Sequence, residues 1–175
     1  MNKDERIEMY KEIYNSQIDR KDNLKSKLFF PSGILVLFMT LANYLFQVFE
    51  KAPGGLIDLL FLVSFTILII KILISLYYIY NSWKGYDYAY LPKAKEIECF
   101  YHKKDDDEAF KDFLIKKYTK SIDINFQNNK NLRTNLFKIQ KNLIQALIFA
   151  IISVFLINID MFYNYLVNIE SIISF

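Results

Sequence analysis

The sequence predicts an all-α membrane protein with three transmembrane helices, an amphipathic N-terminal helix and a small helical domain outside the bilayer. Of its 175 residues, 53% are hydrophobic and 17% are aromatic, which is rich for a soluble domain of this length. Three apolar runs, 28–49, 56–80 and 142–159, each have a length close to or above the roughly 20 residues that span a bilayer. Between the last two, residues 81–141 are rich in Lys, Asp, Asn and Tyr, so this segment is expected outside the lipid.

The N-terminal segment 1–27 is predicted to be a charged amphipathic helix. Its apolar residues recur at helical spacing: Ile7, Tyr10, Ile13, Tyr14 and Ile18. Asn2 and Glu5 have the spacing of a capping box, in which two side chains satisfy free backbone N–H groups at a helix start.

Residues 28–80 are predicted to form a hairpin of two membrane helices. The first run, 28–49, has no ionisable residue, and Pro31 falls in its first turns, where proline is tolerated. Residues 50–55 contain Pro and two Gly and predict a tight turn. The second run, 56–80, carries two charges, Asp58 and Lys71.

The domain 81–141 is predicted to be helical. Four acidic residues at 105–108 suit the positive end of a helix dipole, and residues 93–101 are a weaker helix candidate. The helix after the acidic run has one apolar face, formed by Phe110, Phe113, Leu114, Tyr118 and Ile122. A last helix is expected to start near Asn128 and to run without Gly or Pro into the third span, 142–159. The tail 160–175 is expected to continue that helix or to lie in the membrane interface.

The distribution of Lys and Arg predicts the orientation. Seven basic residues precede the first span, whereas the hairpin turn has only Lys51 and the tail has none. Because positive loops stay in the cytoplasm, the N-terminus and residues 81–141 are expected to be cytoplasmic, and the C-terminus extracytoplasmic.

No catalytic or metal-binding pattern is found in the sequence. The nucleophile–base pairs, glycine-rich phosphate loops and metal clusters that an enzyme needs are not recognised, so we expect no enzyme activity and no cofactor. Cys99 and His102 are too few soft ligands for zinc. The consecutive carboxylates at 105–108 suit helix capping better than convergence on one cation.

A polar stripe on the expected last helix is the most informative pattern. Asparagines and other polar residues recur every three or four residues and enter the third span: Asn128, Asn131, Asn135, Lys138, Asn142 and Gln145. Beside them runs an apolar seam of Leu132, Leu136, Ile139, Leu143, Ala146 and Ala150. The stripe either lines a water-filled vestibule on the axis of a homo-oligomer, or faces the cytosol with Asn142 and Gln145 at the headgroups.

Lys71 lies deep in the second span, where its burial costs about 3 kcal/mol on insertion scales. Ser64, Lys71 and Ser75 share a face, as do Thr40, Asn43 and Gln47 in the first span. Lys71 could line a pore, bond to another helix or snorkel to the interface. In the pore interpretation the lining residues are Lys71, Ser75, Asn142 and Gln145.

Two basic segments are candidates for binding an anionic ligand. The tyrosines of 86–92 lie between Lys84, Lys93 and Lys95, a mixture that stacks bases and neutralises phosphates but that also occurs in interfacial aromatic belts. The second candidate lies on the last helix, where Lys130, Arg133, Lys138 and Lys141 adjoin the polar stripe. We predict that a nucleotide or short single-stranded oligonucleotide binds there, with Lys130, Arg133 and Lys138 contacting phosphates and Asn131 and Asn135 donating hydrogen bonds.

A charged N-terminal helix, a tight membrane hairpin over 28–80 and a compact Lys-rich domain together resemble the small membrane effectors of bacterial anti-phage systems, the SLATT class. The third span departs from the plain two-span pattern and is closer to the membrane effector of Hailong systems. That resemblance implies an oligomeric channel in the bacterial inner membrane, with residues 81–141 as a cytoplasmic crown. It also implies a partner nucleotidyltransferase whose DNA oligomer binds the crown and holds the channel shut.

Two functions therefore stand as hypotheses. The first is a homo-oligomeric, ligand-gated channel-type effector, for which Lys71, the polar stripe and the basic domain are the motivation. The second is a non-conducting membrane anchor or scaffold that recruits a protein partner.

Overall fold

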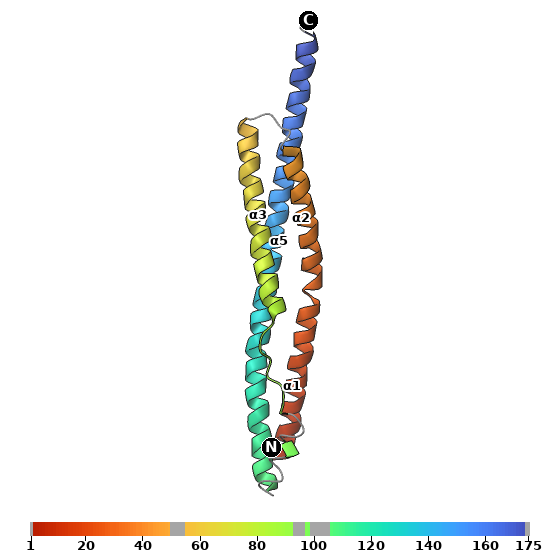
Figure 1. The fold of residues 1–175 in the computed structure, drawn as a ribbon. Helices are drawn as coiled ribbons and strands as arrows, with labels where there is room; N and C mark the ends of the chain where they lie inside the picture. Colours follow the sequence, from red (N-terminus) through yellow and green to blue (C-terminus); the bar gives the residue numbers. More distant parts are fainter. Residues whose placement is uncertain (1, 50–54, 93–96, 99–105, 174–175) are drawn as a thin grey trace. The chain divides into compact units, whose positions relative to one another are not determined.

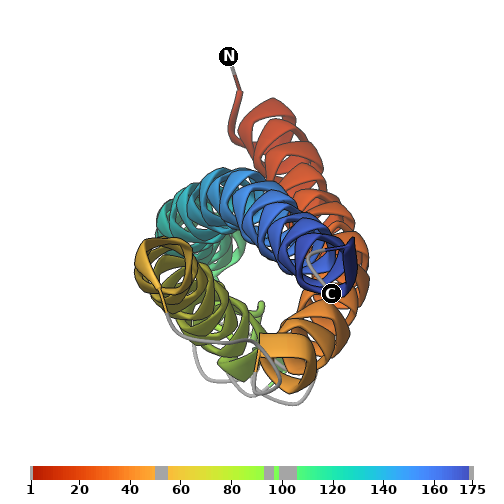
Figure 2. The same ribbon diagram turned by 90° about the horizontal axis from the view of Figure 1, so that it is seen from above.

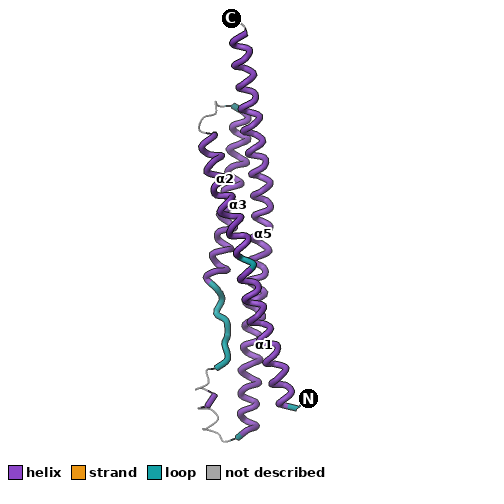
Figure 3. The backbone as a smooth tube through the Cα atoms, turned by 90° about the vertical axis from the view of Figure 1, so that its right-hand side faces the viewer, coloured by secondary structure: helices purple, strands orange, loops and turns teal. Residues whose placement is uncertain are grey.

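The structure is a computed structural model that describes residues 2–49, 55–92, 97–98 and 106–173. In these ranges the chain is helical, with no strand, and four helices account for almost all of it (Figures 1 and 3). They are α1 (Lys3–Ser26), α2 (Phe29–Phe49), α3 (Leu56–Lys84) and α5 (Asp107–Ile173). The predicted hairpin turn at 50–54, most of the weak helix candidate 93–101, and Cys99 and His102 lie outside the described residues.

The helices are grouped into two compact units. Unit 1 contains Met1–Lys27 and Ser82–Asn135, and unit 2 contains Leu28–Asn81 and Leu136–Phe175. The residues of unit 2 have as many acidic as basic side chains, so the formal net charge of +3 belongs entirely to unit 1.

The predicted capping box at the start of α1 is confirmed. The Asp4 backbone N–H donates to Asn2 Oδ1 at 2.6 Å, and the Asn2 N–H donates to the Glu5 carboxylate at 3.1 Å. Of the expected apolar residues on this helix, Tyr14 is buried and Ile13 is exposed.

The boundary between α1 and α2 at Lys27–Leu28 agrees with the predicted limit of the first span. Pro31 explains the interruption, because its ring lacks an N–H for the Lys27 carbonyl and clashes with that carbonyl in a regular helix. The regular helical hydrogen bonding resumes one residue later, where the Ser32 N–H donates to the Leu28 carbonyl at 3.1 Å.

The second membrane helix, α3, is longer than predicted. The sequence predicts its end at Tyr80, but α3 continues to Lys84. It ends at Gly85, whose φ of +86° lies in the left-handed region that glycine adopts at low cost.

The largest correction concerns α5. A separate last helix starting near Asn128 is wrong, since one helix runs from Asp107 to Ile173. Asp106 caps its start, where its side chain accepts from the Glu108 N–H at 3.0 Å and the Ala109 N–H at 3.3 Å. No Gly or Pro interrupts this stretch, so the helix continues through the tail beyond residue 160.

Three helical stretches are long and apolar enough to cross a membrane: Lys3–Phe49, Leu56–Lys84 and Asp107–Ile159. Each contains one of the apolar runs that the sequence indicates. The chain is therefore an all-helical membrane protein.

Unit 2 is a bundle in which α2, α3 and the C-terminal part of α5 pack side by side (Figures 1 and 2). The buried residues of each helix alternate at spacings of three and four, as in a coiled-coil seam. On α2 they are Pro31, Leu35, Phe38, Ala42 and Leu45; on α3, Asp58, Phe61, Ser64, Leu68, Ile72, Ser75 and Ile79; on α5, Leu136, Ile139, Leu143, Ala146, Ala150 and Ser153. The predicted apolar seam of α5 is thus confirmed as buried.

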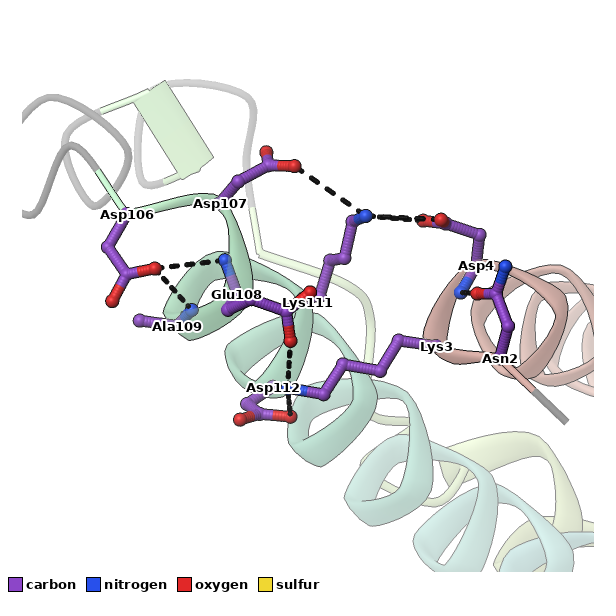
Figure 4. A network of polar contacts seen from close by, with 9 residues as sticks. All are labelled: Asn2, Lys3, Asp4, Asp106, Asp107, Glu108, Ala109, Lys111 and Asp112. Atoms are coloured by element: carbon purple, nitrogen blue, oxygen red, sulfur yellow. Dashed lines mark hydrogen bonds and ion pairs between the residues drawn. The ribbon is translucent and has the colours of Figure 1, made fainter.

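Unit 1 joins α1 to the N-terminal part of α5 through aromatic and charged contacts. The Tyr14 and Tyr118 rings meet edge to face with centroids 6.0 Å apart. At the helix starts, Lys3 pairs with Glu108 at 2.6 Å and Asp112 at 2.9 Å, and Lys111 pairs with Asp4 at 3.0 Å (Figure 4). These carboxylates raise the pKa values of both lysines, because each stabilises the protonated amine.

Candidate functional site

Asparagines of α5 hold the backbone of the segment 86–90, which we call the tyrosine segment. Asn125 is fully buried; its Nδ2 donates to the Ala89 carbonyl at 3.0 Å and its Oδ1 accepts from the Ala89 N–H at 2.9 Å. One side-chain amide thereby satisfies both polar groups of a residue in extended chain, which has no helical partner for them. Asn128 Nδ2 donates to the Asp87 carbonyl at 2.9 Å and holds the same segment two residues earlier.

Asn129 links all three parts of unit 1. Its Nδ2 donates to the backbone carbonyl and to Oε1 of Gln17 in α1, at 2.8 and 2.9 Å. Its Oδ1 accepts from the Tyr88 hydroxyl at 2.8 Å. Asn129 is only 2% exposed, so these bonds replace water that the amide cannot reach.

Lys21 of α1 lies against the rings of the tyrosine segment. Its Nζ is 5.3 Å from the centroid of Tyr88 and 5.6 Å from that of Tyr90, within the range of a cation–π interaction. Burial lowers the pKa of Lys21, but the contact with the Tyr90 hydroxyl and the ion pair with Asp22 outweigh it, so the pKa is raised. Burial raises the pKa of Tyr88 to about 12, and Tyr86, Asp22 and Tyr90 add to the effect.

The shift of Tyr88 predicts a loss of stability at alkaline pH. An unfolded tyrosine has a pKa of about 10, so between this value and the folded pKa of about 12 the folded chain binds more protons. The contribution of Tyr88 is thus fully present below about pH 10 and is lost as the pH rises toward 12. Thermal unfolding of the protein and of Tyr88→Phe, compared from pH 9 to 12, should show a smaller alkaline loss in the variant. Tyr77→Phe, at an exposed tyrosine of α3, is the control; identical profiles for all three proteins would contradict the assignment.

The predicted ligand-binding residues are placed in different surroundings. Lys130, Asn131 and Arg133 are exposed on α5 within unit 1. Asn135 is half-buried and its Nδ2 donates to the Tyr86 hydroxyl at 3.0 Å. Lys138 belongs to unit 2, where its Nζ lies 5.0 Å from the Tyr78 ring centroid. The first three therefore present free surface, whereas the other two already contact tyrosines of α3 and the segment after it.

Contacts within unit 2 fix the depth of Lys71. Phe46 stacks on Phe65, with centroids 6.4 Å apart, and Phe49 stacks on Phe61 at 4.7 Å. Helices α2 and α3 are therefore antiparallel. Thr40 lies six residues before Phe46 and Lys71 six residues after Phe65, so Thr40 lies level with Lys71. Thr40 is next to the midpoint of α2, so Lys71 lies near the middle of the span.

The contacts of α3 with α5 place Lys71 opposite Gln145. The Ser64 and Ser153 hydroxyls are 2.8 Å apart, and Lys138 lies over Tyr78. From the Lys138–Tyr78 contact, one heptad along α3 leads to Lys71 and one heptad along α5 leads to Gln145. Because a step of one heptad keeps the same helix faces opposed, Lys71 and Gln145 lie opposite each other. Both residues are half-buried at the edge of the buried seam, and the Lys71 side chain has no hydrogen-bond or ion-pair partner among the described residues.

The other two predicted pore-lining residues differ from each other. Ser75 is fully buried in the seam, with its hydroxyl donating to the Lys71 carbonyl at 2.9 Å. Asn142 is half-buried, and its Nδ2 donates to the Lys138 carbonyl of its own helix at 2.8 Å. The polar edge of unit 2 therefore consists of Lys71, Asn142 and Gln145.

The sequence did not reveal the buried asparagines. Because the predicted last helix starts near Asn128, the predicted apolar seam begins only at Leu132. Continued toward the N-terminus at the same spacing, it passes through Asn129, Asn125, Ser121 and Tyr118, all of which are buried. Within the described part of the chain, no group of three or more His, Cys, Asp or Glu side chains could hold a metal ion.

In comparisons with known proteins, no family model, curated protein or solved structure matches this chain.

Proposed function

We propose that this chain forms an oligomeric, ligand-gated channel in the membrane and acts as an effector of bacterial anti-phage defence, the role that its resemblance to small membrane effectors implies. The observation that carries the channel is Lys71. An ammonium near the middle of a membrane span is costly unless water or an anion reaches it. Lys71 has no counterion among the described residues and lies level with the polar Gln145. A water-filled path along this edge would hydrate both side chains.

Gating is proposed to come from an anionic nucleotide or oligonucleotide at the exposed basic residues of unit 1. Lys130 and Arg133 lie three residues apart on one side of α5, and unit 1 carries the whole net positive charge. In a symmetric oligomer the fields of these side chains would add, so a modest charge per chain would become a strong anion site. The same α5 helix contains the third span, so a ligand that prefers one packing of the helix would shift the channel equilibrium.

Ion flux from proteoliposomes tests the proposal directly. Purified protein should release a trapped ion, and nucleotides or short DNA oligomers should change the rate. Protein that inserts and oligomerises but never conducts, with or without these ligands, would overturn the channel and favour the scaffold.

Charge reversal at Lys130 and Arg133 should abolish oligonucleotide binding. Lys130→Glu with Arg133→Glu replaces phosphate attraction with repulsion, while the exposure of both residues leaves insertion and assembly intact. Binding of a labelled single-stranded oligonucleotide, measured at several salt concentrations, should show wild-type affinity falling steeply with salt.

A matched control separates a site from a general charge effect. Lys116→Glu with Lys120→Glu changes the net charge equally, on exposed residues of the same helix about 20 Å away. Equal losses in both double variants would show diffuse attraction, and affinity indifferent to salt would exclude phosphate contacts.

One observation favours the alternative of a non-conducting scaffold. Asn135, which is predicted to bind the ligand, and Asn128 of the same polar stripe are bonded to the tyrosine segment, so these two stripe residues already help to fold unit 1. A preformed unit of this kind could recruit a protein partner without any ion flux.

A further inference from the structure

The face of α2 that points away from the bundle carries a polar stripe inside the membrane. Its residues repeat at spacings of three and four, the same alternation as the buried seam: Gly33, Val36, Thr40, Asn43 and Gln47. At 100° per residue, this stripe is centred opposite the buried residues of α2. Thr40, Asn43 and Gln47 are exposed in the isolated chain, and Val36 is 62% exposed. A Cβ added at Gly33 would meet nothing within 4 Å. Helix α2 thus has two faces with seam spacing. The buried face packs inside unit 2, whereas the polar stripe is exposed.

Two amides of this stripe have unmet hydrogen bonds. The Thr40 hydroxyl donates to the Val36 carbonyl of its own helix at 3.1 Å, but the side chains of Asn43 and Gln47 have no partner among the described residues. Asn43 lies about 6 Å from the midpoint of α2, well inside a hydrocarbon core of about 30 Å. Water does not reach a lipid-facing amide at this depth, and leaving it unpaired costs several kcal/mol.

We propose that this stripe is the surface through which α2 packs against α2 of a second copy of the chain. A primary amide both donates and accepts, so Asn43 of one copy can satisfy Asn43 of the other across a two-fold axis, and Gln47 can do the same one turn away. Gly33, which lacks a side chain, and the small Thr40 allow close approach of two helices, as at other membrane helix interfaces. The seam spacing suits shallow left-handed packing.

The self-association surface goes beyond the proposed function, because it would operate in a conducting channel and in a silent scaffold alike. Its test therefore measures association and not flux.

Cysteine cross-linking locates the surface. In a Cys99→Ser background, Val36→Cys places a thiol on the stripe without removing either amide. Leu37→Cys is the matched control: Leu37 is at almost the same depth and is 69% exposed, but it lies off the stripe. In liposomes the Val36 thiol should form disulfide-linked dimers under mild oxidation, and the Leu37 thiol should not. Equal cross-linking at both positions would overturn the proposal.

Amide variants test the hydrogen bonds. In the Val36→Cys background, Asn43→Leu should weaken dimerisation by about five- to thirty-fold, the effect expected for losing interhelical amide bonds, and Asn43→Gln should retain it. If Asn43→Leu leaves cross-linking unchanged, the amides do not pair between copies. Labelling of the Val36 thiol by a membrane-impermeant reagent would instead place the stripe on water and would overturn self-association.

Discussion

Replacement of Lys71 by leucine is expected to favour insertion of the second span by about 3 kcal/mol while abolishing ion flux. Insertion improves because leucine removes a charge from the middle of α3. Flux is lost because, among the described residues of unit 2, Lys71 is the charge at the depth of Gln145, and a narrow path lined there by leucine would lose its water. The measurements are the inserted fraction of α3 in a membrane-insertion assay and ion release from proteoliposomes.

The matched control applies the same substitution elsewhere on the helix. Lys84→Leu changes an exposed lysine at the end of α3 and should alter neither insertion at mid-depth nor flux. Unchanged flux in Lys71→Leu would mean that this side chain only extends toward the interface. Improved insertion together with lost flux is a result that a merely tolerated lysine would not give.

The second large effect is expected from Asn125→Ala. The substitution removes the fully buried amide that bonds both the N–H and the carbonyl of Ala89, and leaves those groups without partners. At about 1–3 kcal/mol for each unsatisfied buried group, we expect unit 1 to lose about 2–4 kcal/mol of stability. Proteolysis within the tyrosine segment and the thermal unfolding of unit 1 should report the loss.

Asn131→Ala is the control for this change. Asn131 lies on the same helix but is exposed, so its replacement should alter stability by less than about 0.5 kcal/mol. Similar stability of the two variants would show that the tyrosine segment does not depend on Asn125. Asn125 is distant from the membrane spans along α5. We therefore expect Asn125→Ala to change ion flux in assembled protein only by destabilising unit 1.

The sequence alone determined the membrane character of the chain and most helix limits. Long apolar runs leave no other solution, since every backbone polar group in lipid must be satisfied within a helix. The break at Lys27–Leu28 follows from Pro31, the start of α5 from the acidic cap at Asp106, and the seam through Leu132 to Ala150 from its spacing. Each of these is a local property, fixed by residues a few positions apart.

Only the tertiary structure decided what the polar residues contact. Spacing put Asn128 and Asn135 on one stripe, but an asparagine at a given register can face water, a ligand or a buried backbone with equal ease. Their partners are in residues 86–90, more than thirty-five positions away, and Asn125 and Asn129 are buried by the same segment. The depth of Lys71 relative to Gln145 likewise depends on the register between α3 and α5, which the Ser64–Ser153 and Lys138–Tyr78 contacts of the folded bundle fix and which no local pattern encodes.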